Sequence, residues 1–148
     1  MRRKSSKKNS WEDHYTRKAR KDRYPARSVY KLQEIQQKFR IIKKGDNVLD
    51  LGCAPGSWLL YAAELTSGGG KVVGIDQKPV AIQTPDHVKV YTGDALDEVE
   101  TVVGMIGRGF NVVISEAVKR RFRQQKTFKP QSSRKASKEI FIIGLDKI

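Results

Sequence analysis

The amino-acid sequence predicts a single α/β domain with a mostly parallel sheet. Three apolar stretches each lead to an aspartate, at Asp50, Asp76 and Asp94. A glycine-bracketed turn and a helical pattern separate the first stretch from the second, which is the order of a βαβ unit. A chain of 148 residues is one domain long.

The N-terminal part is expected to hold a tail and a charged segment. Residues 1–10 are basic and of low complexity, which predicts a disordered tail before a domain at residues 11–148. Residues 11–24 then interleave Trp11, His14, Tyr15 and Tyr24 with basic side chains. Aromatic rings in such a setting either stack on nucleic-acid bases or pack the segment onto the domain.

The next stretch, residues 26–42, has a helical pattern. Val29, Leu32 and Phe39 recur at helical spacing and predict a buried stripe. Lys31 lies on a different face of this helix, so it points away from the core. Ser28 is expected to cap the start of the helix.

Residues 47–58 combine a buried strand, a tight turn and a helix start. Gly52 and Gly56 allow close approach of a ligand, which predicts a nucleotide-cofactor site. The spacing differs from the G-x-G-x-x-G of dinucleotide sites, and Pro55 removes an N–H group that would face a phosphate. S-adenosylmethionine has no phosphate and carries positive charge, which Asp50 complements. A nicotinamide cofactor is the alternative.

Two further aspartates follow the second and third predicted strands. Asp76 comes 20 residues after Gly56, which suits an acid that binds ribose hydroxyls. Asp94 ends a third alternating run and is expected at the adenine amino group, although an acid in a turn or at a helix start is the other interpretation. All three aspartates fall where parallel strands present ligands.

Basic charge is concentrated at both ends of the chain. Residues 1–40 carry 14 Lys and Arg against 4 Asp and Glu, and residues 116–148 carry 10 against 3. Residues 41–115 carry 6 against 9, so the middle is slightly acidic. This distribution indicates a nucleic-acid partner.

One cysteine, Cys53, excludes a disulfide framework and a zinc cluster. No stretch is long and apolar enough to span a bilayer. The expected location is therefore the cytoplasm, with mitochondrial targeting by the basic N-terminus as the alternative.

Several motifs in order resemble the FtsJ family of ribosomal RNA 2′-O-ribose methyltransferases, also called RrmJ or RlmE. They are Arg27-Ser28-x-Tyr30-Lys31-Leu32, the stretch from Leu49 to Trp58, Val113-Ile114-Ser115, and residues 129–140. The resemblance covers residues 11–148. It implies a Rossmann-like methyltransferase fold with an antiparallel last strand, and transfer of a methyl group from S-adenosylmethionine to a uridine ribose of large-subunit ribosomal RNA.

The resemblance also implies residue roles. Lys31 and Glu139 match two members of the family's Lys-Asp-Lys-Glu catalytic set. Gly56, Trp58, Asp76 and Asp94 match its cofactor residues, with core packing as the other interpretation of Trp58. The expected RNA contacts are Arg27, Lys31, Arg134 and Lys138, and no metal is expected.

The chain departs from the family pattern after Ser115. The family continues with Asp-x-x-Pro, a helix, and a strand that carries the second lysine, whereas this chain passes directly to Glu116. The sequence from Glu116 to Phe122 resembles the family's last helix. The fold is therefore expected to lack one strand and one helix, with an apparent deletion near residues 115 and 116 and a final pair of strands at 127–128 and 140–144.

This departure leaves a second function open. A catalytically inactive module that binds S-adenosylmethionine and RNA in ribosome assembly fits a chain that lacks two of the four catalytic residues. A nicotinamide-dependent oxidoreductase is a more distant third. The strong positive charge favours a monomer.

Overall fold

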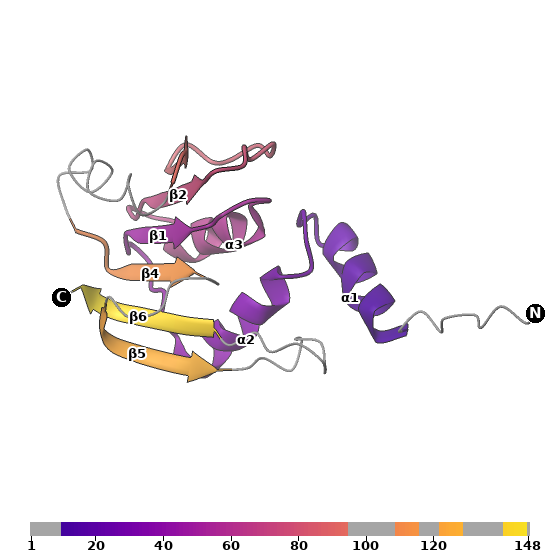
Figure 1. The fold of residues 1–148 in the computed structure, drawn as a ribbon, viewed down its shortest axis with the longest axis horizontal. Helices are drawn as coiled ribbons and strands as arrows, with labels where there is room; N and C mark the ends of the chain where they lie inside the picture. The colour runs from indigo at the N-terminus through magenta and orange to yellow at the C-terminus, as the bar shows by residue number, and fades with distance from the viewer. Residues whose placement is uncertain (1–9, 95–108, 116–121, 129–140, 148) are drawn as a thin grey trace, which may run out of the picture.

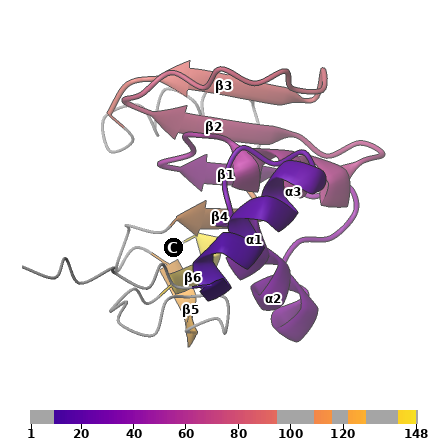
Figure 2. The ribbon, with the colours of Figure 1, turned by 90° about the vertical axis from the view of Figure 1, so that its right-hand side faces the viewer.

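The computed structural model describes residues 10–94, 109–115, 122–128 and 141–147, and for residues 10–13, 122–128 and 141–147 it describes the backbone alone. Its elements form one sheet with α2 and α3 packed on one face, and α1 lies beyond the ends of the strands, against α2 (Figures 1 and 2). The helices are α1 (Ser10–Lys21), α2 (Val29–Phe39) and α3 (Ser57–Thr66). The strands are β1 (Val48–Leu51), β2 (Val72–Asp76), β3 (Val88–Thr92), β4 (Val112–Ser115), β5 (Phe122–Phe128) and β6 (Phe141–Lys147).

The sheet order is β3-β2-β1-β4-β6-β5. The first four strands in this order are parallel, whereas β6 is antiparallel to both β4 and β5. The predicted parallel sheet with an antiparallel last strand is therefore confirmed. β1 lies between β2 and β4, with Val48 opposite Val72 on one side and Val112 on the other.

Two apolar clusters cover the two faces of the sheet. Strands β1, β2 and β4 are buried at nearly every position, as expected for parallel strands inside an α/β domain. One cluster joins this sheet to α2 and α3 and includes Leu32, Ile35 and Leu59. The other lies on the opposite face and contains Leu49, Leu51, Val73, Ile75 and Val113.

The sequence-based bounds of α2 were too wide. The helix begins at Val29 rather than Ala26, and Ser28 makes no side-chain capping bond. It ends at Phe39, because Arg40 adopts a left-handed conformation with φ 47°. Val29 and Leu32 are buried as predicted, and Tyr30 is buried as well.

The C-terminal strands also differ from the expectation. The resemblance places Phe122 in a basic helix, but Phe122 begins β5, which pairs with β6 along its length. Both strands are longer than the predicted final pair. Residues 116–121 lie outside the described part of the chain. So do residues 1–9 of the expected tail, while Ser10 is already in α1.

Gly74 of β2 allows α3 to pack closely on the sheet. A Cβ atom at this position would lie 2.7 Å from Cys53 Sγ and 2.7 Å from Leu59 Cδ2. Both neighbours are buried, so neither side chain has free space to move into.

We expect Gly74→Ala to lower the free energy of unfolding by about 1–3 kcal/mol, the usual cost of overpacking a core. Urea denaturation measures the change. Gly109→Ala is the matched control, because a Cβ atom there meets nothing within 4 Å. Equal stability of the two variants would contradict the close packing at Gly74.

Helix α1 packs on α2 through aromatic side chains. The rings of Tyr15 and Tyr30 lie 5.5 Å apart, and Ala19 is buried between the helices. The Tyr30 hydroxyl donates a 2.7 Å hydrogen bond to Asp22, which also accepts one from Lys18 at 2.9 Å. Of the two interpretations of the aromatic residues, packing therefore applies to Tyr15.

Tyr24 ties the end of this segment to α3. Its hydroxyl donates to the two carboxylate oxygens of Glu64 at 2.9 and 3.1 Å. Burial and the bond to Glu64 raise the pKa of Tyr24 well above its usual value. Tyr24 thus stays protonated, remains a donor, and also has a packing role.

The α1 contact predicts a specific pH dependence. The hydrogen bonds from Tyr30 and Lys18 lower the pKa of Asp22 below its usual value of 3.8. The stabilisation is therefore present above pH 3.8 and is lost as the pH falls through the lower folded-state pKa. We expect the stability difference between the wild type and Tyr30→Phe to shrink below pH 3.8.

Urea denaturation at a series of pH values measures this difference, and NMR titration of the Asp22 carboxyl carbon reports its pKa. Tyr30→Phe should move that pKa upward toward 3.8. An unchanged Asp22 titration in Tyr30→Phe would contradict the assigned hydrogen bond.

Candidate active site

The candidate site lies where β1 and β2 end and the glycine loop begins. The strand order changes direction at β1, because the chain goes on to β2 and β3 on one side and returns to β4 on the other. In open α/β sheets, ligands bind at this switch point beyond the carboxyl ends of the strands. The glycine loop, residues 52–56, occupies this position.

The hydrogen bonds of the glycine loop decide which ligands it suits. The N–H groups of Gly52 and Cys53 both donate to the Ile75 carbonyl, at 2.8 and 3.3 Å. The N–H of Ala54 donates to Asp76 Oδ2 at 2.9 Å, and Pro55 has no N–H. The loop therefore uses these three donors within the protein and does not offer them to a phosphate.

Gly52 forms the open part of the loop. It is exposed, has φ 79°, and a Cβ atom there would meet no atom within 4 Å. A positive φ favours glycine, and the absence of a side chain leaves the backbone open to a ligand. Gly56, in contrast, is buried beneath Val80 and Ile82 of the connection after β2.

Asp76 organises the loop as well as ending β2. Its Oδ2 accepts from Ala54, and its Oδ1 accepts a 2.8 Å hydrogen bond from the Lys78 N–H. Asp94 lies close by, since Gln77 Nε2 donates to its Oδ2 at 3.4 Å and the Gly93 N–H donates to the Asp76 carbonyl. The structure thus brings these two predicted cofactor residues together at one edge of the sheet.

Asp50 lies beneath the loop, not on its surface. It is 2 % exposed and sits within β1. Burial, followed by the charges of Asp50 and Asp76, raises the pKa of the Cys53 thiol to about 12. The thiol is therefore protonated at neutral pH, which agrees with a space-filling role for Cys53.

The start of α2 is fixed against the start of α3. Ser57 Oγ accepts a 2.8 Å hydrogen bond from the Ala26 N–H and donates one of 3.1 Å to the Ala26 carbonyl. Trp58 Nε1 donates to the Ser28 carbonyl at 2.8 Å, and the same carbonyl accepts from the Lys31 N–H at 3.1 Å. These contacts place half-buried Lys31 beside the helix that follows the glycine loop.

Trp58 is a core residue in this structure. It is 6 % exposed and packs with the cluster that joins the sheet to α2 and α3. Its contact with Ser28 gives it a positioning role for the segment that carries Arg27 and Lys31. Contact with a cofactor remains a prediction for Trp58.

Ser57 was not singled out from the sequence. A serine directly after Gly56 at a helix start indicates a local cap, whereas its hydrogen bonds reach Ala26, 31 residues away. Asp22, which fixes Tyr30 in α2, was missed for the same reason. The local sequence around Ser57 or Asp22 does not indicate which residue either side chain will bond.

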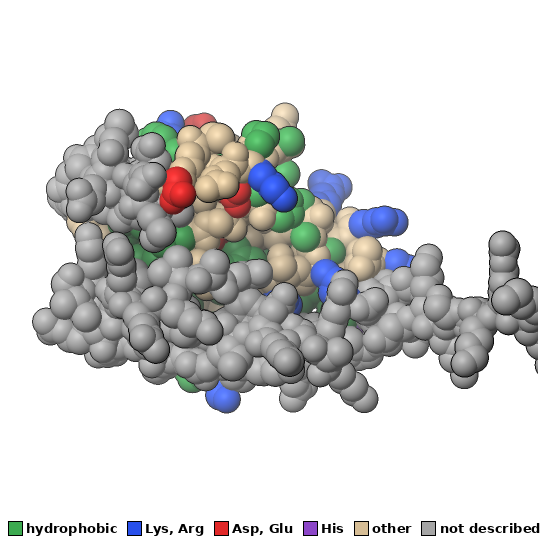
Figure 3. Space-filling model, in the orientation of Figure 1, with side chains coloured by type: hydrophobic (Ala, Val, Ile, Leu, Met, Phe, Trp, Pro, Cys, Tyr) green, Lys and Arg blue, Asp and Glu red, His purple; other side chains and the backbone are tan. Residues whose placement is uncertain are grey.

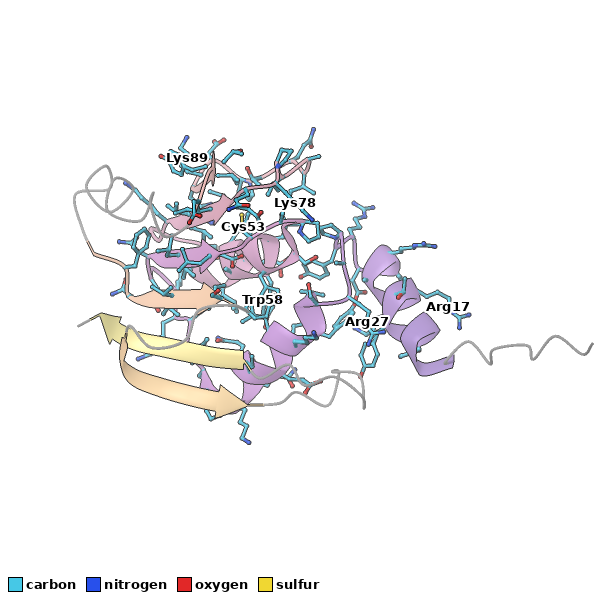
Figure 4. The ribbon with its side chains drawn as sticks, in the orientation of Figure 1. Arg17, Arg27, Cys53, Trp58, Lys78 and Lys89 are labelled. Carbon is cyan, nitrogen blue, oxygen red and sulfur yellow. The ribbon has the colours of Figure 1, made fainter. Side chains whose placement is uncertain are left out.

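Basic side chains lie on the same side of the molecule as the site. Arg27 lies over the Tyr15 ring, with 5.5 Å between its guanidinium carbon and the ring centroid. Figure 4 shows Arg27 and Arg17 beside α1, and Lys78 in the connection after β2. Figure 3 shows Lys and Arg side chains along the right-hand part of this face, over α1. The arrangement suits a polyanion approaching the strand ends.

Three predicted site residues, Arg134, Lys138 and Glu139, lie outside the described residues. Within the part that the structure describes, no group of three or more His, Cys, Asp or Glu side chains is arranged to hold a metal ion. None of the described helices is long and apolar enough to cross a membrane.

The sequence matches the FtsJ-like methyltransferase family in two overlapping parts, residues 24–116 and 99–147. The ribosomal RNA large subunit methyltransferase E of Desulforapulum autotrophicum is 42% identical over 193 aligned positions, which cover 95% of each chain. The protein of the same name from Desulfatibacillum aliphaticivorans is 34% identical and covers 99% of this chain and 96% of its own. An alignment of 193 positions with a 148-residue chain requires gaps in this chain.

A solved structure agrees with the fold. A Plasmodium falciparum protein assigned as a ribosomal RNA methyltransferase superposes with a TM-score of 0.65 at 20% identity, covering 84% of this chain and 98% of its own. This likeness supports the Rossmann-like arrangement of the sheet. The family match and the 42% identical relative show that the chain belongs to the FtsJ-like methyltransferase family.

Proposed function

We propose that this chain transfers a methyl group from S-adenosylmethionine to a ribose 2′-hydroxyl, on a uridine of large-subunit ribosomal RNA. The observation that carries the proposal is the glycine loop, whose N–H groups at Gly52, Cys53 and Ala54 are used within the protein. The relatives named ribosomal RNA large subunit methyltransferase E support the choice of RNA.

The loop and its aspartates fit S-adenosylmethionine better than a dinucleotide. A dinucleotide needs backbone N–H donors for its pyrophosphate, and this loop has already used three. Open space at Gly52 and the carboxylates of Asp76 and Asp94 suit a cofactor with a ribose, an adenine amino group and positive charge. In this proposal Asp76 binds the ribose, Asp94 the adenine, and Gly52 leaves room for the ligand.

When bound, S-adenosylmethionine supplies an electrophilic methyl group. The protein must then position a ribose 2′-hydroxyl, which is a weak nucleophile, and assist loss of its proton. Lys31 is the candidate for this task, and the hydrogen bonds that join its backbone through Ser28 to Trp58, in the first turn of α3, support the choice. Glu139 is the second candidate, from the family resemblance alone.

RNA is proposed to approach across the basic side of the site. Arg27 and Lys31 share the segment that Ser57 and Trp58 fix against α3. Arg134 and Lys138 are further proposed contacts from the resemblance. Cations of this kind orient the phosphate backbone, while the reacting ribose is placed at the strand ends.

The gap in the alignments with relatives bears on whether this chain is an active enzyme. The two matched stretches overlap at residues 99–116, and the alignments with relatives contain gaps in this chain. We infer that the gap falls after β4, where the resemblance expects the second lysine and an aspartate. The names of the relatives favour an active enzyme. The alternative, an inactive module that binds RNA, is distinguished from it by the experiment below.

The test is transfer of labelled methyl from S-adenosylmethionine to undermodified large ribosomal subunits by this 148-residue chain. We expect the label in a nuclease-resistant 2′-O-methyl dinucleotide from one uridine. Binding of both cofactor and RNA without label would instead identify the inactive module. Tighter binding of NAD than of S-adenosylmethionine would overturn the cofactor assignment. A monomer in the cytoplasm is the state and location we propose.

A further inference from the structure

A second group of basic side chains lies at the end of α2. It is near the amino ends of the strands, whereas the glycine loop lies at their carboxyl ends. Here α2 leads into the amino end of β1, and an open hollow forms beside the connection. We call it the α2-end hollow. The described residues that line it are Gln36, Gln37, Arg40, Ile42, Lys43 and Lys44.

The charge of the α2-end hollow is strongly positive. Arg40, Lys43 and Lys44 are all exposed, and no carboxylate is among the described residues that line it. The nearby Asp46 uses its Oδ2 to accept a 2.8 Å hydrogen bond from the Lys43 N–H. Three exposed cations on six lining residues are complementary to a polyanion.

The backbone that carries these cations is held in one arrangement. The Gln36 side chain donates to the Ile42 carbonyl at 2.8 Å and accepts from the Ile42 N–H at 3.0 Å. The Arg40 N–H donates to the Gln36 carbonyl at 2.8 Å, which closes the end of α2. Such preorganisation lowers the conformational entropy that ligand binding must overcome.

We propose that the α2-end hollow binds phosphate groups of the RNA backbone, as a contact separate from the catalytic edge. The proposal rests on the proposed RNA substrate. At about 1.5 Å per residue, Arg40 lies about 14 Å along α2 from Lys31. The α2 residues of the hollow, Gln36 and Gln37, lie on a different face of the helix from Lys31. An RNA strand must therefore run along α2 and pass around its end to contact both Lys31 and the hollow, which a dinucleotide bound at Lys31 is too short to do.

The experiment compares two variants with equal loss of charge. Lys43→Gln/Lys44→Gln removes two of the three cations of the hollow and retains most of each side-chain stem. The Lys44 stem is worth keeping because it packs over Gly68, where a Cβ atom would lie 2.6 Å from Lys44 Cε. Lys71→Gln/Lys89→Gln is the matched control, at exposed positions beside Asp86 and His87. Arg40 is left unchanged because of its left-handed backbone.

RNA affinity is measured against salt concentration for a fragment of large-subunit ribosomal RNA and for a dinucleotide. For the long RNA, the hollow variant should lower the slope of log affinity against log salt by about 1.4, the value for two phosphate contacts to a single strand. The control should keep the wild-type slope. For the dinucleotide, both variants should bind as the wild type does.

Two failures are distinguishable. Wild-type binding with an unchanged slope in the hollow variant, or an equal fall in the control, would overturn the phosphate site and leave the proposed function intact. If the wild-type chain bound S-adenosylmethionine but not ribosomal RNA, the proposed function would fail, and the phosphate site with it.

Discussion

Asp76→Ala is expected to weaken S-adenosylmethionine binding by at least about a hundredfold. The carboxylate accepts from the N–H groups of Ala54 and Lys78, at 2.9 and 2.8 Å. Hydrogen bonds to a charged group contribute about 1.5–3 kcal/mol each, and about 2.7 kcal/mol already corresponds to a hundredfold change in affinity. The substitution removes the acceptor that shapes the glycine loop as well as the proposed ribose contact.

Isothermal titration with S-adenosylmethionine measures this effect without requiring methyl transfer. Asp86→Ala is the matched control, because it removes the same charge from an exposed residue just before β3, at the end of the sheet opposite the glycine loop. We expect the control to bind as the wild type does. Asp76→Asn separates the two roles, since an amide oxygen still accepts one backbone N–H but lacks the charge. Wild-type affinity in Asp76→Ala would remove Asp76 from the site.

The strand and loop pattern was predictable because it depends on local sequence. Parallel strands buried on both faces require continuous apolar runs, and the sequence contains them at β1, β2 and β4. The turn after β1 requires a positive φ, which Gly52 supplies. The positions of Asp76 and Asp94 near one another then follow from parallel pairing of β2 with β3.

The details of α2 were not predictable, because contacts distant in sequence determine them. Ala26 has a helical neighbourhood, but its N–H and carbonyl are both bonded to Ser57, so the helix starts later. At the other end, the Gln36 side chain binds the backbone of Ile42, and the helix ends before it. Helical periodicity contains no information on either partner.

Strand β5 was also not predictable from local sequence, because pairing with β6 determines its structure. The residues around Phe122 resemble a helix, yet the backbone pairs with β6 from Phe122 opposite Lys147 to Phe128 opposite Phe141. Pairing with a neighbouring strand overrides a weak local preference. Likewise, the family motif associates Trp58 with the cofactor, whereas its indole N–H donates a hydrogen bond to the Ser28 carbonyl.

Lys31→Ala is expected to lower the rate of methyl transfer by about 10²–10⁴-fold, the usual contribution of a general acid or base. S-adenosylmethionine affinity should stay unchanged, because the N–H groups of the glycine loop donate to the Ile75 carbonyl and to Asp76. Single-turnover transfer of labelled methyl measures the rate, with RNA affinity determined in parallel. Lys38→Ala is the matched control on the same helix, at an exposed position near its end.

Comparing the change in methyl-transfer rate with the change in RNA affinity in Lys31→Ala identifies the role of Lys31. A large loss of rate with RNA affinity retained assigns Lys31 to the reacting hydroxyl, because a missing phosphate contact would weaken RNA binding and reduce its salt dependence instead. Trp58→Phe provides an independent check, since it removes the indole N–H that holds Ser28 while Lys31 remains. If Lys31 acts in catalysis and Trp58 positions it, Trp58→Phe should lower the rate less than Lys31→Ala and leave RNA affinity unchanged. Methyl transfer at the wild-type rate in Lys31→Ala would show that the ribose hydroxyl loses its proton to another group.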